Sequence, residues 1–171
     1  MFENPNPYMY EARNSTVDSW GKDLTCSIKY KFDQYGFRNF NNYEKKPDLV
    51  FFGCSLLFGI GVEKQDAFTS NFNCWNFGLA GKYTEGEILE CYNQFQDLKI
   101  DCKMVFVWRN KDWLPNLNFG DQNKIYHCLP FKNENKNHVR LLDYVDYDVS
   151  GTHWGIKTHQ KFGKLLSSFL K

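Results

Sequence analysis

The chain has 171 residues, which is enough for one domain with a single hydrophobic core. Hydrophobic residues make up 42% of it, aromatic residues 18% and charged residues 24%, and the formal net charge is +1. This near-neutral balance gives no electrostatic reason to expect binding to nucleic acid or to an anionic membrane surface. No apolar stretch is long enough to cross a bilayer, so a membrane-spanning protein is not expected.

Residues 1–23 contain many turn formers and little periodicity, so we expect an irregular N-terminal arm followed by one domain over residues 24–171. The first eleven residues are polar and contain Asn and Pro, which is unlike a signal peptide. A cytoplasmic location is therefore expected, with export by another route left open.

The six cysteines are scattered, with no C-x-x-C pair and no clustered Cys/His spacing of the kind that binds zinc. We therefore expect free thiols in a reduced compartment and no metal. The pair Gly59 and Gly61 lacks the third glycine of a dinucleotide fingerprint, and no P-loop is present, so no cofactor is expected. The cysteines are Cys26, Cys54, Cys74, Cys91, Cys102 and Cys128.

The first predicted strand covers residues 25–32, where apolar and polar side chains alternate. A turn at Gly36 and a polar loop over residues 39–47 follow. Residues 49–52 then form a continuous apolar run of β-branched and aromatic side chains, whose length suits a buried parallel strand. Periodicity alone leaves a short helix as the alternative for this run.

The apolar run stops at Gly53, and Cys54 and Ser55 follow at once. A strand that ends in this way and then turns puts the Ser55 hydroxyl at the carboxyl edge of a sheet, where open α/β folds bind their ligands. A serine there is a candidate nucleophile if a base reaches it, although a plain helix cap explains Ser55 equally well when it is taken alone. Cys54 is disfavoured as the nucleophile, because alternation along the strand points it the other way.

The remaining segments alternate between helix and strand, which indicates a parallel sheet flanked by helices. Thr84 opens an amphipathic helix, and Glu87 three residues later completes a capping-box pattern. We predict an α/β fold, a three-layer α/β/α sandwich with a mostly parallel sheet of about five strands. The other predicted elements are a short helix within residues 63–72, strands at 74–77, 103–108, 125–131 and 141–149, and a final helix at 155–170.

Polar residues recur where these strands end. Gly81, Asn110 and His153 each follow a different predicted strand, as Ser55 does, so they are expected to converge on one edge of the sheet. Taken singly, Gly81 is explained as a turn glycine, Asn110 as a residue that closes its own loop, and His153 as a helix cap.

Other histidines and aromatic residues receive no catalytic role from the sequence. We expect His127, His138 and His159 to lie away from the site, with His159 on the surface of the last helix. Four aromatic residues flank the predicted site, and either stacking on a sugar ring or ordinary packing would explain them. They are Tyr83, Trp108, Trp113 and Trp154.

The motifs, taken in order, resemble those of the SGNH (GDSL-type) hydrolase superfamily. G-C-S-L-L-F-G-I-G at residues 53–61 is similar to the family's G-D-S-x-[TS]-x-G-x-G block, and residues 76–81 are similar to its N-x-[GS]-x-x-G block. S-G-T-H-W-G at 150–155 resembles the block that carries the family's histidine, and Y-G-F-R at 35–38 resembles a stretch that often precedes the first block. Of the family's G-x-N-D block, only Asn110 is kept.

The resemblance implies the SGNH (flavodoxin-like) hydrolase fold and a serine esterase or acyl hydrolase that acts on a small-molecule or carbohydrate ester, such as an O-acetyl group. Ser55 would attack the acyl carbonyl, and His153 would accept its proton. The backbone N–H groups of Ser55 and Gly81, with the Asn110 side-chain amide, would form the oxyanion hole. The oligomeric state is left undetermined.

One position departs from the family's pattern. The family usually places an Asp three residues before the histidine, and Ser150 stands there. The nearest acid is Asp148, which a bulged loop could bring to His153; otherwise Ser150 or a backbone carbonyl would orient the ring. Together with Lys111, this change supports a rival interpretation, a catalytically weakened SGNH-like domain that binds a glycan or acyl group without turnover.

Overall fold

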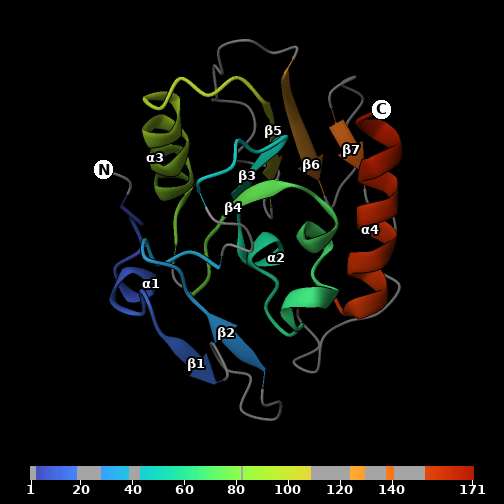
Figure 1. Ribbon diagram of the computed structural model, residues 1–171. Coiled ribbons are helices and arrows are strands. Elements are labelled where there is room, and N and C mark those ends of the chain that lie inside the picture. Colours follow the sequence, from blue (N-terminus) through green and yellow to red (C-terminus); the bar gives the residue numbers. More distant parts are fainter. Residues whose placement is uncertain are drawn as a thin grey trace.

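The computed structural model describes residues 3–18, 28–38, 43–81, 83–108, 124–129, 138–140 and 153–171. These residues form an α/β fold around a parallel sheet with the strand order β4-β3-β5-β6-β7 (Figure 1). The expected α/β class with a parallel sheet is therefore confirmed. The strands of this sheet are β3 (Leu49–Gly53), β4 (Cys74–Gly78), β5 (Lys103–Val107), β6 (Ile125–Leu129) and β7 (His138–Arg140).

Strand β3 lies in the interior of the sheet and is buried along its whole length. Its side chains alternate between two cores, with Val50 and Phe52 in one and Leu49 and Phe51 in the other. Helix α3 (Glu85–Gln96) packs into the first core and helix α4 (Ile156–Phe169) into the second, so the two helices lie on opposite faces of the sheet (Figure 1). Burial on both faces explains why this stretch is apolar without alternation.

Helix α3 begins as the sequence predicts. The Thr84 hydroxyl accepts a hydrogen bond from the Glu87 N–H at 3.4 Å, and the Glu87 carboxylate accepts one from the Thr84 N–H at 2.6 Å. This capping box satisfies backbone donors that a helix leaves unpaired at its start. It also fixes the backbone where the loop after β4 enters the helix.

The N-terminal segment is more regular than the expected irregular arm. It contains α1 (Pro7–Glu11) and β1 (Thr16–Asp18), and β1 pairs antiparallel with β2 (Lys29–Lys31) in a separate two-stranded sheet. Asn6 caps α1 by accepting a hydrogen bond from the Met9 N–H at 3.2 Å, and Met9 is fully buried. Asn followed by Pro is a helix-start signal, and the prediction missed it because the helix has only five residues.

Two further expectations concern short elements. The helix expected within residues 63–72 is present as two 3₁₀ helices, η1 (Lys64–Asp66) and η2 (Phe68–Asn71). The strand expected at 141–149 lies outside the described residues, and strand β7 at 138–140 was not predicted. None of the helices in the described part of the chain is long and apolar enough to span a membrane.

Candidate functional site

Ser55 is the first residue of α2 (Ser55–Phe58), which begins directly after β3 with Cys54 as its N-cap. Ser55 is only 2% exposed, at the carboxyl edge of the sheet. The end of β3 approaches β5 closely because residue 53 is glycine. A Cβ there would overlap the carbonyl oxygen of Val107 on β5. The Cys54 side chain is fully buried in the core that α4 covers.

The end of β4 supports α2 from the other side. The Asn76 side-chain Oδ1 accepts a hydrogen bond from the Gly78 N–H at 2.9 Å, and its Nδ2 donates to the Leu57 carbonyl of α2 at 3.4 Å. The Leu79 N–H donates to the Gly53 carbonyl at 2.8 Å. A Cβ at Gly78 would lie 2.6 Å from the Phe58 nitrogen, so only glycine allows this close approach of strand and helix.

Arg38 holds the far end of α2 and the loop beyond it. Its guanidinium donates to the carbonyl oxygens of Phe58 at 3.1 Å, Gly59 at 2.6 Å and Val62 at 2.8 Å. It also lies 4.6 Å from the centre of the Tyr30 ring, and Arg38 is only 2% exposed. Burial lowers the pKa of the Arg38 guanidinium to about 10, so the group is still charged at neutral pH. The Y-G-F-R stretch therefore fixes the turn that carries Ser55.

His153 reaches Ser55 from the opposite end of the chain. Its Nε2 lies 3.0 Å from Ser55 Oγ, although the two residues are 98 positions apart in the sequence. At this separation the Ser55 hydroxyl can donate a hydrogen bond to an imidazole nitrogen that carries no proton. The contact places a hydroxyl beside a side chain that can act as a base.

Tyr83 makes a contact that the sequence did not suggest. The Ser55 backbone N–H donates to the Tyr83 hydroxyl oxygen at 3.3 Å, and the same oxygen lies 3.4 Å from Ser55 Oγ. Tyr83 is half-buried and packs against both cores. Its sequence position marked it only as one of several aromatic residues near the site.

The structure brings together only part of the predicted site. Gly81 lies in the loop between β4 and α3 with a φ of 84°, a backbone conformation that favours glycine. Asn110, Asp148 and Ser150 lie outside the described residues, as does Trp113.

The expectation that His159 lies on the surface is wrong. His159 is 1% exposed, its Nδ1 accepts a hydrogen bond from the Phe68 N–H at 3.3 Å, and its ring stacks on the Phe68 ring. The buried face of α4 therefore includes a polar residue, His159, which accepts a hydrogen bond from the first residue of η2. Ile156 and Phe169, the first and last residues of α4, are exposed by 43% and 38%.

Two of the flanking tryptophans are core residues. Trp108 is fully buried and its Nε1–H donates to His127 Nδ1 at 3.0 Å, and Trp154 is 2% exposed. Packing, and not stacking on a sugar ring, therefore explains both of these residues.

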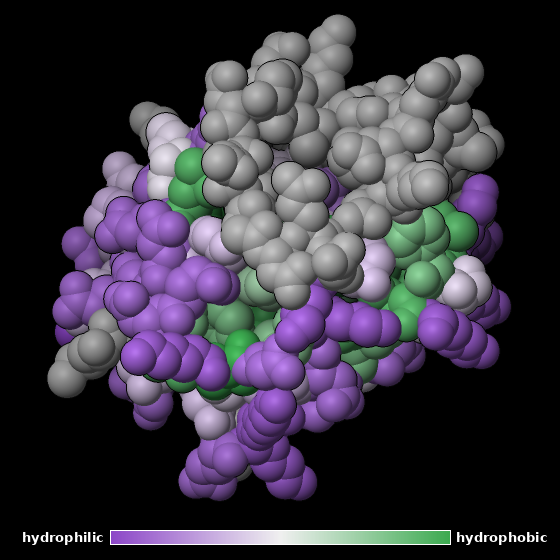
Figure 2. Space-filling model, turned by 90° about the horizontal axis from the view of Figure 1, so that it is seen from above, coloured by the Kyte–Doolittle hydropathy of each residue, from purple (hydrophilic) through white to green (hydrophobic). Residues whose placement is uncertain are grey.

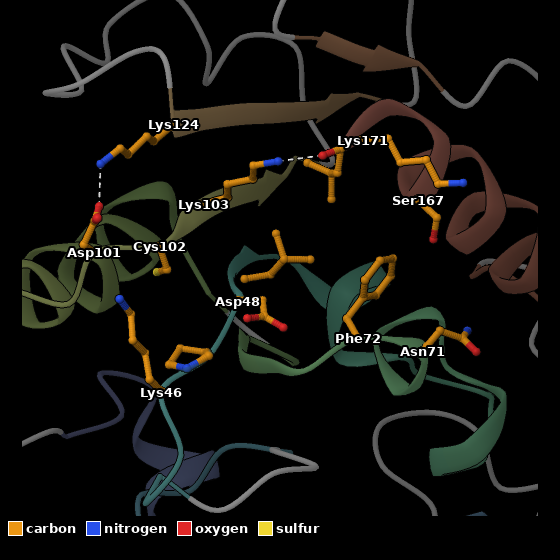
Figure 3. A pocket seen from close by; sticks show the side chains of 13 residues that line it. Lys46, Asp48, Asn71, Phe72, Asp101, Cys102, Lys103, Lys124, Ser167 and Lys171 are labelled. Carbon is orange, nitrogen blue, oxygen red and sulfur yellow. Dashed lines mark hydrogen bonds and ion pairs between the residues drawn. The ribbon is translucent and has the colours of Figure 1, made fainter.

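A cavity of about 650 Å³ lies at the opposite, amino edge of the sheet, where β3 and β5 begin (Figure 3). Its charged side chains are partly paired, since Lys103 donates to the Leu170 carbonyl at 2.6 Å and Lys124 pairs with Asp101. The Cys102 thiol also lines it, and burial raises the pKa of this thiol to about 11, which keeps it protonated.

The described residues contain no group of three or more His, Cys, Asp or Glu side chains that could hold a metal ion. The five cysteines among them form no disulfide with one another. On the face seen in Figure 2, hydrophilic side chains cover most of the described surface and leave only small hydrophobic patches between them.

Fold and site define the chain as an α/β protein with a parallel sheet and a serine–histidine pair at the carboxyl edge. Comparison with protein-family models, with curated proteins and with solved structures found no match.

Proposed function

We propose that this protein is a serine hydrolase of the SGNH type, which cleaves an ester bond of a small-molecule or carbohydrate substrate. The observation that carries the proposal is the distance of 3.0 Å between His153 Nε2 and Ser55 Oγ at the carboxyl edge of a parallel sheet. The packing of α3 and α4 on opposite faces of that sheet is what a three-layer SGNH sandwich would have.

The reaction would proceed through an acyl-enzyme. Ser55 Oγ attacks the acyl carbonyl while its proton passes to His153 Nε2, and the carbonyl oxygen becomes an oxyanion. The Ser55 N–H would stabilise that oxyanion, with the Gly81 N–H and the Asn110 side chain as further donors. His153 then protonates the departing alcohol, and afterwards it removes a proton from the water that releases the acid.

The surroundings of Ser55 support this role better than a plain helix cap. An N-cap residue precedes the helix and accepts from its N–H groups, whereas here Cys54 is the N-cap and Ser55 is the first helical residue. The Ser55 hydroxyl is thus available to His153. Arg38 and Asn76 stand in stretches that resemble family blocks. They donate to the Gly59 and Leu57 carbonyls and so hold the short helix that begins at Ser55.

The second candidate is a weakened SGNH-like domain that binds a glycan or acyl group without turnover. Ser150 favours it, because a neutral hydroxyl in the place of the orienting carboxylate cannot stabilise an imidazolium equally well. The Tyr83 hydroxyl at the Ser55 N–H also favours it, because that donor is already engaged.

Hydrolysis of p-nitrophenyl acetate by the purified protein separates these candidates. We expect turnover by the wild type and a loss of about 10⁵-fold or more in Ser55→Ala. Ser70→Ala is the matched control, because it removes an exposed hydroxyl that bonds only locally to the Gln65 carbonyl. A folded Ser55→Ala protein with undiminished turnover would rule out the assignment, and ligand binding without turnover by the wild type would favour the second candidate.

A further inference from the structure

We propose that the Tyr83 hydroxyl occupies the oxyanion position of the free protein and that a substrate carbonyl must displace it. The inference rests on the proposed function of Ser55. Its basis is the hydrogen bond of 3.3 Å from the Ser55 N–H to the Tyr83 oxygen, because this N–H is the donor that an oxyanion would need.

The phenol and a substrate oxygen cannot share this N–H. A substrate oxygen would lie about 2.9 Å from the nitrogen and close to the N–H direction, as hydrogen-bond geometry requires. The Tyr83 oxygen already lies in that direction at 3.3 Å, so the two oxygens would be within about 2 Å of each other. Even a short O–H···O hydrogen bond keeps its oxygens about 2.5 Å apart. The hydroxyl therefore has to move before the carbonyl is polarised.

Displacing the hydroxyl requires the Tyr83 side chain to rotate. Thr84, the next residue, is held by the capping box of α3, which fixes the chain on that side. The Tyr83 ring is only half-buried, at the margin of both cores, so a rotation toward solvent does not empty a fully packed site. The Tyr83 hydroxyl acts as a plug that side-chain rotation removes.

This arrangement has a specific kinetic signature. The plug stabilises the free protein and is absent from both the substrate complex and the transition state, so it raises KM and leaves kcat unchanged. A neutral hydrogen bond of this kind corresponds to a factor of about 2–10 in an equilibrium constant. If Tyr83 instead donated to the oxyanion, its loss would lower kcat by about 10²-fold or more.

The test compares Tyr83→Phe with the wild type, because phenylalanine keeps the ring and removes only the oxygen. Tyr126→Phe is the control, since Tyr126 is also half-buried at the margin of the α4-side core but lies on β6. Two quantities are measured: kcat and KM for p-nitrophenyl acetate, and the Kd of phenylboronic acid. The boronic acid forms a tetrahedral adduct with a nucleophilic serine and places an oxygen in the oxyanion position.

We expect KM and Kd to fall about 3- to 10-fold in Tyr83→Phe, with kcat unchanged and with Tyr126→Phe like the wild type. Unchanged KM and Kd, or a fall in kcat, would overturn the plug while leaving the hydrolase assignment in place. If the boronic acid binds none of the proteins and Ser55→Ala hydrolyses the ester like the wild type, both the plug and the proposed function are overturned.

Discussion

The two edges of the central sheet use their polar side chains in different ways. At the carboxyl edge, the Ser55 hydroxyl contacts His153 and Tyr83, which come from distant parts of the chain. At the amino edge, around a cavity of about 650 Å³, Lys103 is bonded to a backbone carbonyl and Lys124 to a carboxylate. The cavity and the serine–histidine pair therefore lie at different edges of the sheet.

Parallel strands are the reason for this difference. Strands β3, β4 and β5 all end at one edge, so the segments that follow them meet there, and polar residues placed directly after a strand are brought together. The amino edge instead collects the beginnings of β3 and β5 and the end of α4, as Figure 3 shows, and two of its lysines, Lys103 and Lys124, are paired there.

The largest expected effect separates two histidines. His153→Ala should lower kcat/KM for p-nitrophenyl acetate by about 10⁴-fold, because it removes the base at the carboxyl edge. His159→Ala should destabilise the fold, because His159 is buried against Phe68, yet the folded molecules should keep their turnover. The measurement is kcat/KM together with a thermal melt of each variant. Equal losses of turnover in the two variants would contradict the role given to His153.

The next prediction concerns the group that orients His153. If the Asp148 carboxylate fixes the imidazole, Asp148→Asn should lower kcat by about 10²- to 10⁴-fold. Ser150→Asp should then raise kcat only slightly. Both positions lie outside the described residues, so the kinetics decide between them. If Ser150→Asp instead raises kcat strongly and Asp148→Asn has no effect, the natural protein has a serine–histidine dyad with no orienting carboxylate. That result would favour the domain that binds without turnover.

A third prediction concerns Arg38, which holds the end of α2 and the loop after it at the carboxyl edge. Arg38→Met should lower the free energy of unfolding by about 3 kcal/mol, because it leaves the carbonyls of Phe58, Gly59 and Val62 without their guanidinium donor. Arg13→Met is the matched control, since Arg13 also donates to a carbonyl but is exposed, and it should change that free energy by about 0.5 kcal/mol or less. Urea denaturation measures both, and similar values would show that Arg38 does not hold the turn.

The smallest effect is expected at the amino edge. Lys103→Met removes the hydrogen bond to the Leu170 carbonyl and should cost about 1 kcal/mol of stability. Turnover should not change, because the side chain lies at the other end of β5 from Ser55. A tenfold loss of turnover in Lys103→Met would break the distinction between the two edges.

The sequence was sufficient where a local pattern determined the structure. The apolar run of β3 and the capping box of Thr84 each depend on a few adjacent residues, and both are found as predicted. The approach of His153 to Ser55 followed from the order of the motifs and the shared edge of parallel strands.

The rest depended on contacts between distant residues. His159 is buried because η2 packs against α4, and nothing in the helix's own sequence indicates this neighbour. Strand β2 lies within the strand predicted at residues 25–32, but its partner β1 has only three residues, a pattern too short to detect. The Tyr83 contact depends on the course of a loop, which the residue types do not determine.

The central claim, that His153 activates Ser55 as a nucleophile, is tested most directly by covalent labelling. The folded wild-type protein is treated with a fluorophosphonate, and the modified residue is located by mass spectrometry of its peptides. We expect one modification, on Ser55, that is slowed at least about 10²-fold in His153→Ala. A protein that leaves Ser55 unmodified, or that labels Ser55 equally fast without His153, would contradict it.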